Sequence, residues 1–194
     1  NGNGGAVAAL SATQFASNST LLVSSSTFSG NIATAGSGGA IVGFNNSTIN
    51  VIDSTLNTNQ ANFGGAIIVQ NSSLSLDNVT LSENVATFDG GALWSQGNGT
   101  ELSHVTITGN HANRAGGGIY MNPSSDPTVV VILDHSIVAG NTLGNGSDSF
   151  DLEGRFVSRG HNLIGQVVGQ GFATSGLTDG GNGDLVGNGN AKLG

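Results

Sequence analysis

A pair of glycines returns at a fixed interval along this chain and constrains its fold more than any other feature. Four pairs stand 26 residues apart, and a looser copy at Gly4-Gly5 precedes them. Each regular pair is followed by Ala or Gly and then by Ile or Leu. Fixed periods of about 20 to 50 residues are typical of solenoids, propellers and arrays. The regular pairs are Gly38 and Gly39, Gly64 and Gly65, Gly90 and Gly91, and Gly116 and Gly117.

A second motif runs in phase with the glycines: an apolar residue, two small or polar residues, and then Asn. Between the two motifs apolar and polar residues alternate, as in Leu74-Ser-Leu76, which predicts short strands. Gly, Asn and Ser separate these runs and favour turns. Each 26-residue unit therefore has about three short strands and three bends. Stacked about 4.8 Å apart by parallel pairing, such units predict an all-β fold, a right-handed parallel β-helix. The Asn residues are Asn31, Asn59, Asn84, Asn110 and Asn141.

Stacking gives both motifs a structural role. The glycine pairs are expected at one corner of every rung, where φ > 0 or close backbone approach excludes a side chain. The Asn residues are expected at another corner, where each amide donates to one neighbouring rung and accepts from the other, forming a ladder. The glycine-rich segment 36–39 is not a nucleotide-binding loop, since it lacks the lysine of a P-loop.

The regular motifs occupy only part of the chain. Residues 1–141 are predicted to form about five rungs, and residues 142–194 a β-rich C-terminal extension that packs on the helix or caps it. Because Asn1 lies inside a repeat frame, we expect the chain to be a processed product or a piece of a longer protein.

The charge balance limits the partners. The 12 acidic residues outnumber the 4 basic ones, for a net charge of -8. Nucleic-acid binding needs clustered Lys and Arg, so nucleic acid is not an expected partner. No apolar run reaches the length of a membrane span, so direct membrane insertion is not expected either.

Two resemblances follow from these motifs. Phe28-Ser-Gly-Asn31 and Gly38-Gly-Ala-Ile41 resemble the repeats of chlamydial polymorphic outer membrane proteins, which are surface β-helices. The segment 147–165, SDSFDLEGRFVSRGHNLIG, is similar to the region after the rungs in bacterial exported β-helix proteins of the "choice-of-anchor" type. The resemblances imply export, a cell-surface or extracellular location, and no defined activity.

Many parallel β-helices are polysaccharide lyases or hydrolases, so this fold can carry a catalytic pair of carboxylates. Aligning the rungs places Asp77, Ser103 and Asp134 in one column, which puts the two carboxylates about 9.6 Å apart, within reach of an inverting pair. His104 and His135 fall in the next column with Asn78. Neighbouring columns on a strand point to opposite faces, so either the Asp set or the His set is expected to face outward. The sequence brings no Arg or Lys to the Asp column. The two histidines, one rung apart, could bind a metal or sense pH.

Two further groups are weaker ligand candidates. Asp179 and Asp184 bracket a glycine-rich segment that resembles a calcium-binding repeat with broken spacing, to which Asp148, Asp151 and Glu153 could add oxygens. Apart from this calcium possibility, no cofactor is expected. Trp94 and Tyr120 occupy equivalent places on consecutive rungs, where they could bind a sugar ring or pack inward.

The sequence predicts a non-enzymatic, extracellular or cell-surface, structural or adhesive β-helix. No capping helix is recognisable at its first rung, and an uncovered end predicts head-to-tail stacking into a filament or sheath. Its expected partners are other copies of itself, end to end, and surface glycans. The alternative is a carbohydrate-binding or polysaccharide-degrading β-helix.

Overall fold

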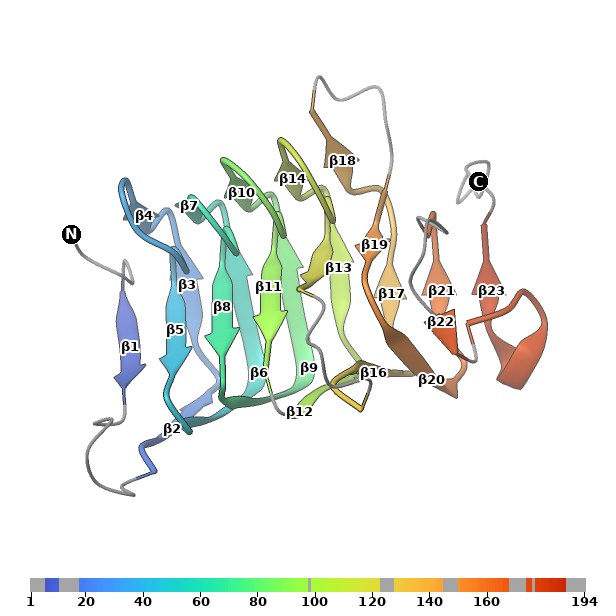
Figure 1. Cartoon of the computed structure of the whole chain (residues 1–194), viewed down its shortest axis with the longest axis horizontal. Helices are drawn as coiled ribbons and strands as arrows, with labels where there is room; N and C mark the ends of the chain where they lie inside the picture. Colours follow the sequence, from blue (N-terminus) through green and yellow to red (C-terminus); the bar gives the residue numbers. More distant parts are fainter. Residues whose placement is uncertain are drawn as a thin grey trace.

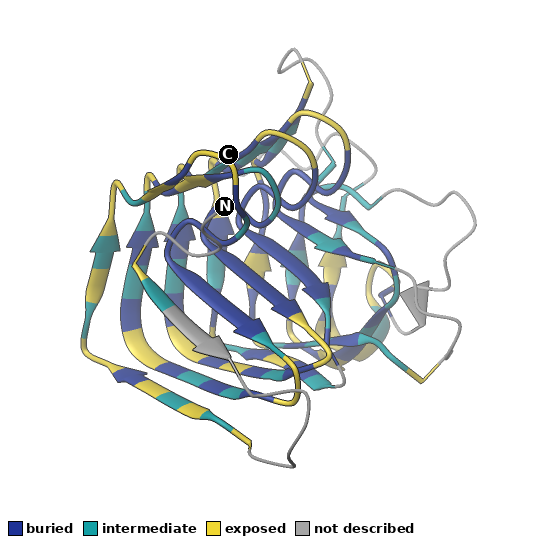
Figure 2. Ribbon diagram, turned by 60° about the vertical axis from the view of Figure 1, so that its left-hand side comes forward, coloured by how far each residue is buried: buried dark blue, intermediate teal, exposed yellow. Residues whose placement is uncertain are grey.

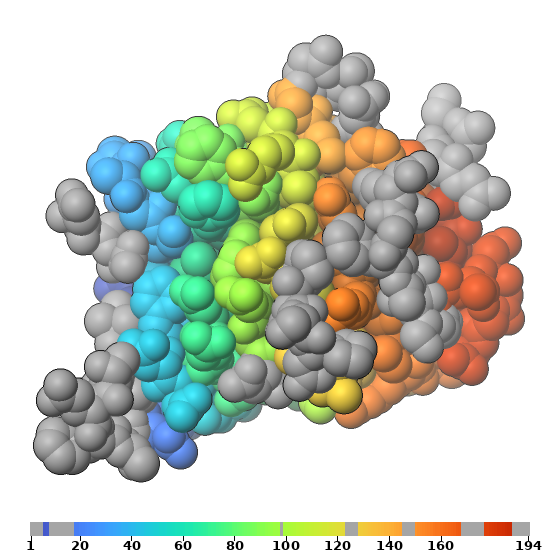
Figure 3. Space-filling model, viewed as in Figure 1, coloured from blue at the N-terminus to red at the C-terminus, as the bar shows by residue number. Residues whose placement is uncertain are grey.

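The computed structural model describes residues 6–10, 18–97, 99–122, 128–144, 150–167, 174–175 and 177–187. Regular structure in these ranges is β throughout, apart from one short 3-10 turn, η1 (Gly181–Gly183). The strands stack as successive turns along the long axis of the molecule (Figure 1). Figure 3 shows the same turns as bands of colour running from one end to the other. Among the described residues, no helix has the length and hydropathy needed to cross a membrane.

Three parallel sheets form the walls of the solenoid, and each of the first five turns, here called rungs, contributes described strands to all three. The first sheet has 6 strands among the described residues: β1 (Val7–Leu10), β5 (Ile41–Phe44), β8 (Ile67–Gln70), β11 (Leu93–Gln96), β15 (Ile119–Met121) and β19 (Leu152–Glu153).

The second sheet is the largest and bends along its length. Its 12 described strands are β2 (Thr20–Ser24), β3 (Thr27–Ser29), β6 (Thr48–Asn57), β9 (Ser73–Ser82), β12 (Gly99–Ser103), β13 (Thr106–Thr108), β16 (Val131–Asp134), β17 (Ile137–Val138), β20 (Phe156–Gly160), β21 (Leu163–Ile164), β22 (Thr174–Ser175) and β23 (Leu185–Val186).

The third sheet is narrow, with two residues from each rung. Its 5 described strands are β4 (Ile32–Ala33), β7 (Gln60–Ala61), β10 (Val85–Ala86), β14 (His111–Ala112) and β18 (Thr142–Leu143). The predicted all-β parallel β-helix with a 26-residue unit is therefore confirmed.

The solenoid continues beyond Asn141, where the sequence analysis ends the rungs. β19, β20 and β21 pair in parallel with the strands of the fifth rung, and β22 and β23 pair with β20 and β21. The range 142–194, set apart as an extension, thus adds a sixth turn and part of a seventh to the same sheets. About six turns are present, whereas about five were predicted from the sequence.

Inward-facing apolar columns fill the solenoid. Figure 2 shows the buried residues recurring from strand to strand along the sheets. In the first sheet Ile41, Ile67, Leu93 and Ile119 pair in register and are completely buried. Because each column repeats similar side chains at the rung spacing, the core is long and thin. Phe156 is the largest fully buried side chain among the described residues.

A smaller apolar cluster lies on the outer side of the first sheet. Val42, Ile68 and Trp94 are buried there, next to Phe63 and Tyr120. Phe63 belongs to the segment that joins the third sheet to the following strand of the first sheet, and it meets Trp94 edge-on with ring centroids 6.4 Å apart. The outer face of this sheet is thus partly covered by the chain itself.

The glycine corner joins the third sheet to the first. Gly64 has φ +58, and Gly38, Gly90 and Gly116 are also in the left-handed region. A Cβ on the second glycine of a pair would collide with the next rung: on Gly65 it would lie 2.2 Å from the carbonyl oxygen of Gly91. A Cβ on Gly64 would also collide with the carbonyl oxygen of Ile67, so the first glycine meets both a conformational and a steric need and the second a steric one.

Candidate functional site

The Asn residues of the repeat form a continuous buried ladder of amides. The backbone N–H and the Nδ2 of Asn59 both donate to Oδ1 of Asn84, each at 2.9 Å, and Asn84 donates in the same way to Asn110. Asn31 and Asn110 continue the pattern toward either end.

The apolar residue of the motif completes the ladder. The Nδ2 of Asn84 also donates to the carbonyl oxygen of Leu56 in the preceding rung, at 2.9 Å. Asn110 makes the same bond to Leu81, and Asn141 to Ile107. The apolar residue and the Asn of the motif are therefore hydrogen-bond partners across rungs, which explains why the two recur in phase.

A buried carboxylate ends this ladder. Asn141 donates its N–H and its Nδ2 to Oδ1 of Asp151, both at 2.7 Å, and Oδ2 of Asp151 accepts the N–H of Gln166 at 2.8 Å. Burial raises the pKa of Asp151, while the hydrogen bonds from Asn141 and Gln166 oppose the rise. An ionised carboxylate only accepts, so it leaves no donor unpaired where the run of amides stops.

A second, shorter ladder ends in the same way. Ser136 donates its N–H to Asn162, and Asn162 donates its N–H and Nδ2 to Oδ1 of Asp184, at 2.8 and 3.1 Å. Asp184 is fully buried. This ladder was not predicted from the sequence, because it lies in a different column from the repeated Asn motif.

The calcium candidates are thus spread over several structural roles. Asp151 and Asp184 end the two ladders, Asp179 is exposed and accepts the N–H of Val186 at 3.1 Å, and Glu153 accepts the N–H of Gly116 at 3.3 Å. Asp148 lies outside the described residues. Within the described part of the chain, no group of three or more His, Cys, Asp or Glu side chains is arranged to hold a metal ion.

The proposed ligand pair Trp94 and Tyr120 lies on neighbouring strands of the first sheet, in direct register. Trp94 is only 8% exposed and packs in the outer apolar cluster, whereas Tyr120 is partly exposed at its edge. Burial raises the pKa of Tyr120, and the nearby carboxylates of Asp89 and Glu153 add to this rise. Trp94 thus presents little of its ring to a ligand in this conformation.

A bend in the second sheet aligns a polar column along the outside of the solenoid. Asp53, Asn78, His104, His135 and His161 hold this corner with φ between 46 and 56. Asn, Asp and His are the side chains most often found in this left-handed region after Gly, so the backbone selects them. Asn78 donates through Nδ2 to Oδ1 of Asp53 at 2.7 Å.

Three histidines stack on this column and are called here the histidine ridge: His104, His135 and His161. Their ring centroids are 5.3 Å apart for the first pair and 4.7 Å for the second, with interplanar angles of 24° and 19°. The sequence analysis found only the first pair. His161 follows His135 by 26 residues, so the repeat period itself could have revealed it.

The expectation that only the Asp set or only the His set faces outward is wrong. The side chains of His104 and Asp77 are 59% and 56% exposed, and those of His135 and Asp134 are 49% and 29% exposed. The left-handed residue at the bend breaks the strict alternation of a strand, so both columns reach solvent.

The Asp residues contact the histidines and are kept apart from each other. His135 Nδ1 lies 2.7 Å from Asp134 Oδ1, and His104 Nδ1 lies 3.4 Å from Asp77 Oδ1 and 2.9 Å from the hydroxyl of Ser103. The register places Ser103 between the two Asp residues, which lie two rungs, or about 9.6 Å, apart.

Beyond the bend, the second sheet presents a face of small polar side chains, seven with a hydroxyl and one with an amide, which we call the threonine face. Two outward columns run side by side on β3, β6, β9 and β13, flanking the inward column of Phe28, Leu56, Leu81 and Ile107. All eight side chains are uncharged. They are Thr27, Thr55, Thr80 and Thr106 in one column, and Ser29, Asn57, Ser82 and Thr108 in the other.

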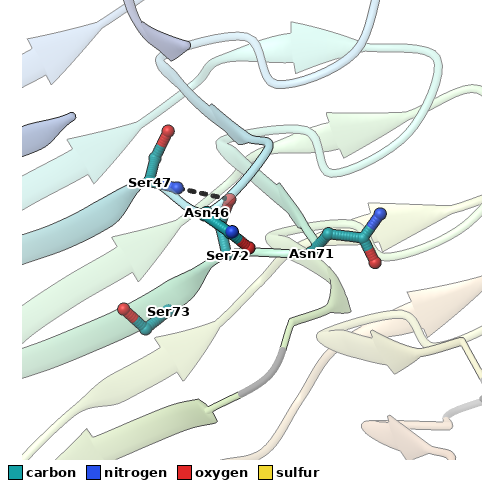
Figure 4. Close-up of a pocket in the computed structure, with 5 residues that line it drawn as sticks. All are labelled: Asn46, Ser47, Asn71, Ser72 and Ser73. Carbon is teal, nitrogen blue, oxygen red and sulfur yellow. Dashed lines mark hydrogen bonds between the residues drawn. The ribbon is translucent and has the colours of Figure 1, made fainter. Parts of the chain in front are cut away.

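A small depression lies where the chain turns from the first sheet into the second (Figure 4). Its volume is ≈ 170 Å³, and Asn46, Ser47, Asn71, Ser72 and Ser73 line it. The N–H of Ser47 donates to the hydroxyl of Ser72 at 3.2 Å, so part of its polar lining is already paired. Pockets that enclose small molecules typically measure about 300–1,000 Å³, so this hollow is too small for most of them.

Comparison with known families supports one of the two resemblances. The Chlamydia polymorphic membrane protein (Chlamydia_PMP) repeat matches residues 25–43 and 104–122. Each matched segment runs from the bend of the second sheet through the ladder Asn to the glycine corner. The segment 147–165, which carries the choice-of-anchor resemblance, lies outside both matches. Neither a curated protein nor a solved structure matches the chain.

Proposed function

We propose that this chain, a β-helix protein with repeats like those of chlamydial polymorphic membrane proteins, is a non-enzymatic structural or adhesive module. The observation that carries the proposal is the threonine face. It is an ordered, uncharged array on a rigid wall, and it suits contact with an extended partner better than capture of a small molecule. The matched repeats support a location on the cell surface, after export.

The chemistry of the threonine face favours adhesion. Neighbouring residues within a column are about 4.8 Å apart, and the two columns are about 6.6 Å apart along the strand. Threonine has a stiff χ1 torsion, so its methyl and hydroxyl groups lose little rotamer freedom when a partner covers them. Surface glycans, with many hydroxyls and apolar ring faces, are the partner class we propose.

The acidic residues support a passive role. Asp134 and Asp77 each contact a histidine of the same corner, and Ser103 lies between them in the register. Each member of the pair is therefore partnered within its own corner.

Self-assembly is the sharper form of the proposal. Oδ2 of Asp151 takes an N–H from Gln166 in the following segment, whereas the equivalent oxygen of Asp184 is buried without a hydrogen-bond partner among the described residues. A rung stacked from another copy would supply such a donor on displacing the part of the chain that buries this oxygen. The first residues, 1–5, on which the expectation of an uncovered first rung rests, lie outside the described residues.

Binding to immobilised glycans and glycan-coated surfaces tests the adhesive role. We expect the purified chain to bind, and the double substitution Thr80→Glu with Thr106→Glu to abolish binding in a variant that its unfolding curve shows to be folded, although two carboxylates on neighbouring strands lower the melting temperature somewhat. Ser75→Glu with Ser24→Glu adds the same charge to outward positions on the other side of the bend and should preserve binding. Equal binding by both variants, or no binding by the wild type, would refute the adhesive role.

Electron microscopy of the untagged chain at increasing concentration tests self-assembly separately. Filaments with an axial repeat near 30 Å, about six rungs at the strand spacing, are expected if rungs stack end to end. Dispersed particles at all concentrations would refute assembly and leave the adhesive test unaffected.

A further inference from the structure

We propose that the histidine ridge binds a divalent transition-metal ion through imidazole nitrogens of neighbouring rungs. The inference is independent of adhesion and of assembly. It rests on three side chains that the solenoid places in one exposed line: His104, His135 and His161.

The backbone fixes the ridge at both ends. Each histidine donates its backbone N–H to a carbonyl oxygen of the following rung: His104 to Asp134, His135 to Gly160 and His161 to Asn182. The residue that follows the acceptor in the sequence is the one stacked against the histidine. The position after His161 is therefore Gly183, which has no side chain to extend the stack. At the other end of the stack, the bend residue of the preceding rung is Asn78.

Hydrogen bonds at Nδ1 prepare two of the rings as ligands. Asp134 Oδ1, at 2.7 Å, favours a proton on Nδ1 of His135, which leaves the lone pair of the ring on Nε2. Nδ1 of His104 makes its hydrogen bond with the hydroxyl of Ser103, at 2.9 Å, and Asp77 Oδ1 lies 3.4 Å from the same nitrogen. A carboxylate behind the imidazole of a metal ligand is the usual second partner of such a histidine, fixing its tautomer and the orientation of its ring.

The spacing suits an ion shared by two neighbouring rings. Bonds of about 2.0–2.1 Å at a tetrahedral angle need two Nε2 atoms about 3.3 Å apart. The ring centroids are 4.7 and 5.3 Å apart, and the rings are about half exposed, so a modest rotation of the side chains brings one pair together. The described residues hold no preformed cluster, so water must complete the coordination shell.

The chemistry of the donors selects the ion. Imidazole suits copper, nickel and zinc, whereas calcium and magnesium prefer oxygen donors. The carboxylates of Asp77 and Asp134 add negative charge beside the ridge. Arg159, the nearby cation on the same sheet, is paired with Glu101 at 3.1 Å, so its charge is compensated. The order of affinity expected for this site is copper above nickel and zinc.

Titration of the untagged chain with Cu²⁺, followed by calorimetry and by electron paramagnetic resonance, tests the site. We expect one ion per chain with nitrogen ligands visible in the copper spectrum. His135 belongs to both ring pairs, so His135→Asn should weaken binding at least tenfold, roughly the loss seen when support of a metal ligand is removed. Asn is chosen because Asn78 already occupies this column with φ 53.

Three matched variants complete the design. His104→Asn and His161→Asn each leave one ring pair and should retain most of the affinity. His111→Asn removes the remaining histidine, which lies on β14 and contacts Thr142 and Asn113, and it should change nothing. Unfolding curves without metal confirm that each variant folds, and Zn²⁺ should raise the melting temperature of the wild type more than that of His135→Asn.

The proposal is overturned if His135→Asn binds Cu²⁺ as tightly as the wild type, or if His111→Asn loses as much affinity as His135→Asn. Absence of nitrogen ligands from the copper spectrum of the wild type would overturn it as well.

Discussion

At the scale of single residues, the amide side chain is what allows one rung to bind the next. Asn84 accepts two hydrogen bonds from the preceding rung and donates to both the preceding and the following rung. Asp has no side-chain donor for such a position, and it is found where each ladder ends. Asn, which donates and accepts, thus occupies the interior of a ladder, and Asp, which only accepts when ionised, occupies its end.

Replacing Asn84 by Leu should lower the free energy of unfolding by about 3 kcal/mol or more, because buried donors of Asn59 and the carbonyl of Leu56 lose their partner. For a chain of this size the melting temperature should fall by roughly 10 °C. Thermal and denaturant unfolding measure the change.

Asn50→Leu is the matched control, since Asn50 faces outward on β6, in register with Leu22. We expect this substitution to change the unfolding free energy by less than about 0.5 kcal/mol. Equal losses for the two variants would mean that the ladder contributes nothing specific to stability.

Asp151 gives stability an inverted dependence on pH. Burial raises its pKa above the ordinary value of 3.8, so in the interval above 3.8 the folded chain holds a proton that the unfolded chain has lost. Stability from this group therefore falls as pH rises through the interval and levels off above the raised pKa. An ion-paired carboxylate behaves in the opposite way.

The unfolding free energy of the wild type, measured relative to Asp151→Asn between about pH 3.5 and pH 7, should decrease as pH rises. Asp53→Asn provides a comparison at an exposed carboxylate. A wild-type advantage that grows with pH would contradict the raised pKa of Asp151.

At the scale of elements, the glycine corner lets rungs approach within backbone contact. Placing a Cβ on Gly65 would bring it 2.2 Å from the carbonyl oxygen of Gly91 and 2.7 Å from the backbone nitrogen of Val85. Backbone atoms of two sheets meet there, so no side chain can turn aside to make room.

Gly65→Ala should therefore reduce the unfolding free energy by about 3 kcal/mol or more, the upper range for overpacking. Gly99→Ala is the control, because a Cβ on Gly99 of β12 meets nothing within 4 Å. It should be neutral or stabilising by up to about 1 kcal/mol. Denaturant unfolding compares the two, and a small loss for Gly65→Ala would show that the rungs can separate at this corner.

Sequence periodicity predicts these elements well wherever a residue has a single physical reason to be there. The glycine pairs and the ladder Asn residues recur because no other side chain meets the same steric and hydrogen-bonding needs. The bend of the second sheet was not predicted, because Asp53, Asn78 and His104 are chemically different and share only a left-handed backbone conformation. The outward position of both the Asp and His columns follows from that bend.

At the scale of the whole molecule, the end of the solenoid was harder to predict than its middle. Past Asn141 the ladder passes to Asp151 after only 10 residues, and a new ladder through Asn162 opens in another column. Beyond Asn141, Asp replaces the Asn of the motif and the next ladder lies in another column, so the repeat cannot be followed in the sequence although the sheets continue. The threonine face could not be identified from sequence, because Thr is also favoured in strands for its propensity alone.

The ladder geometry has a consequence for how such a chain can vary in length. The hydrogen bonds between successive Asn side chains all run from one rung to the next in the same direction, and the contacts made by Asn59, Asn84 and Asn110 are nearly interchangeable. A duplicated or deleted 26-residue unit would present matching surfaces to both of its neighbours. Recombination within the coding sequence can therefore lengthen or shorten the solenoid, while Asp151 and Asp184 still end the two ladders.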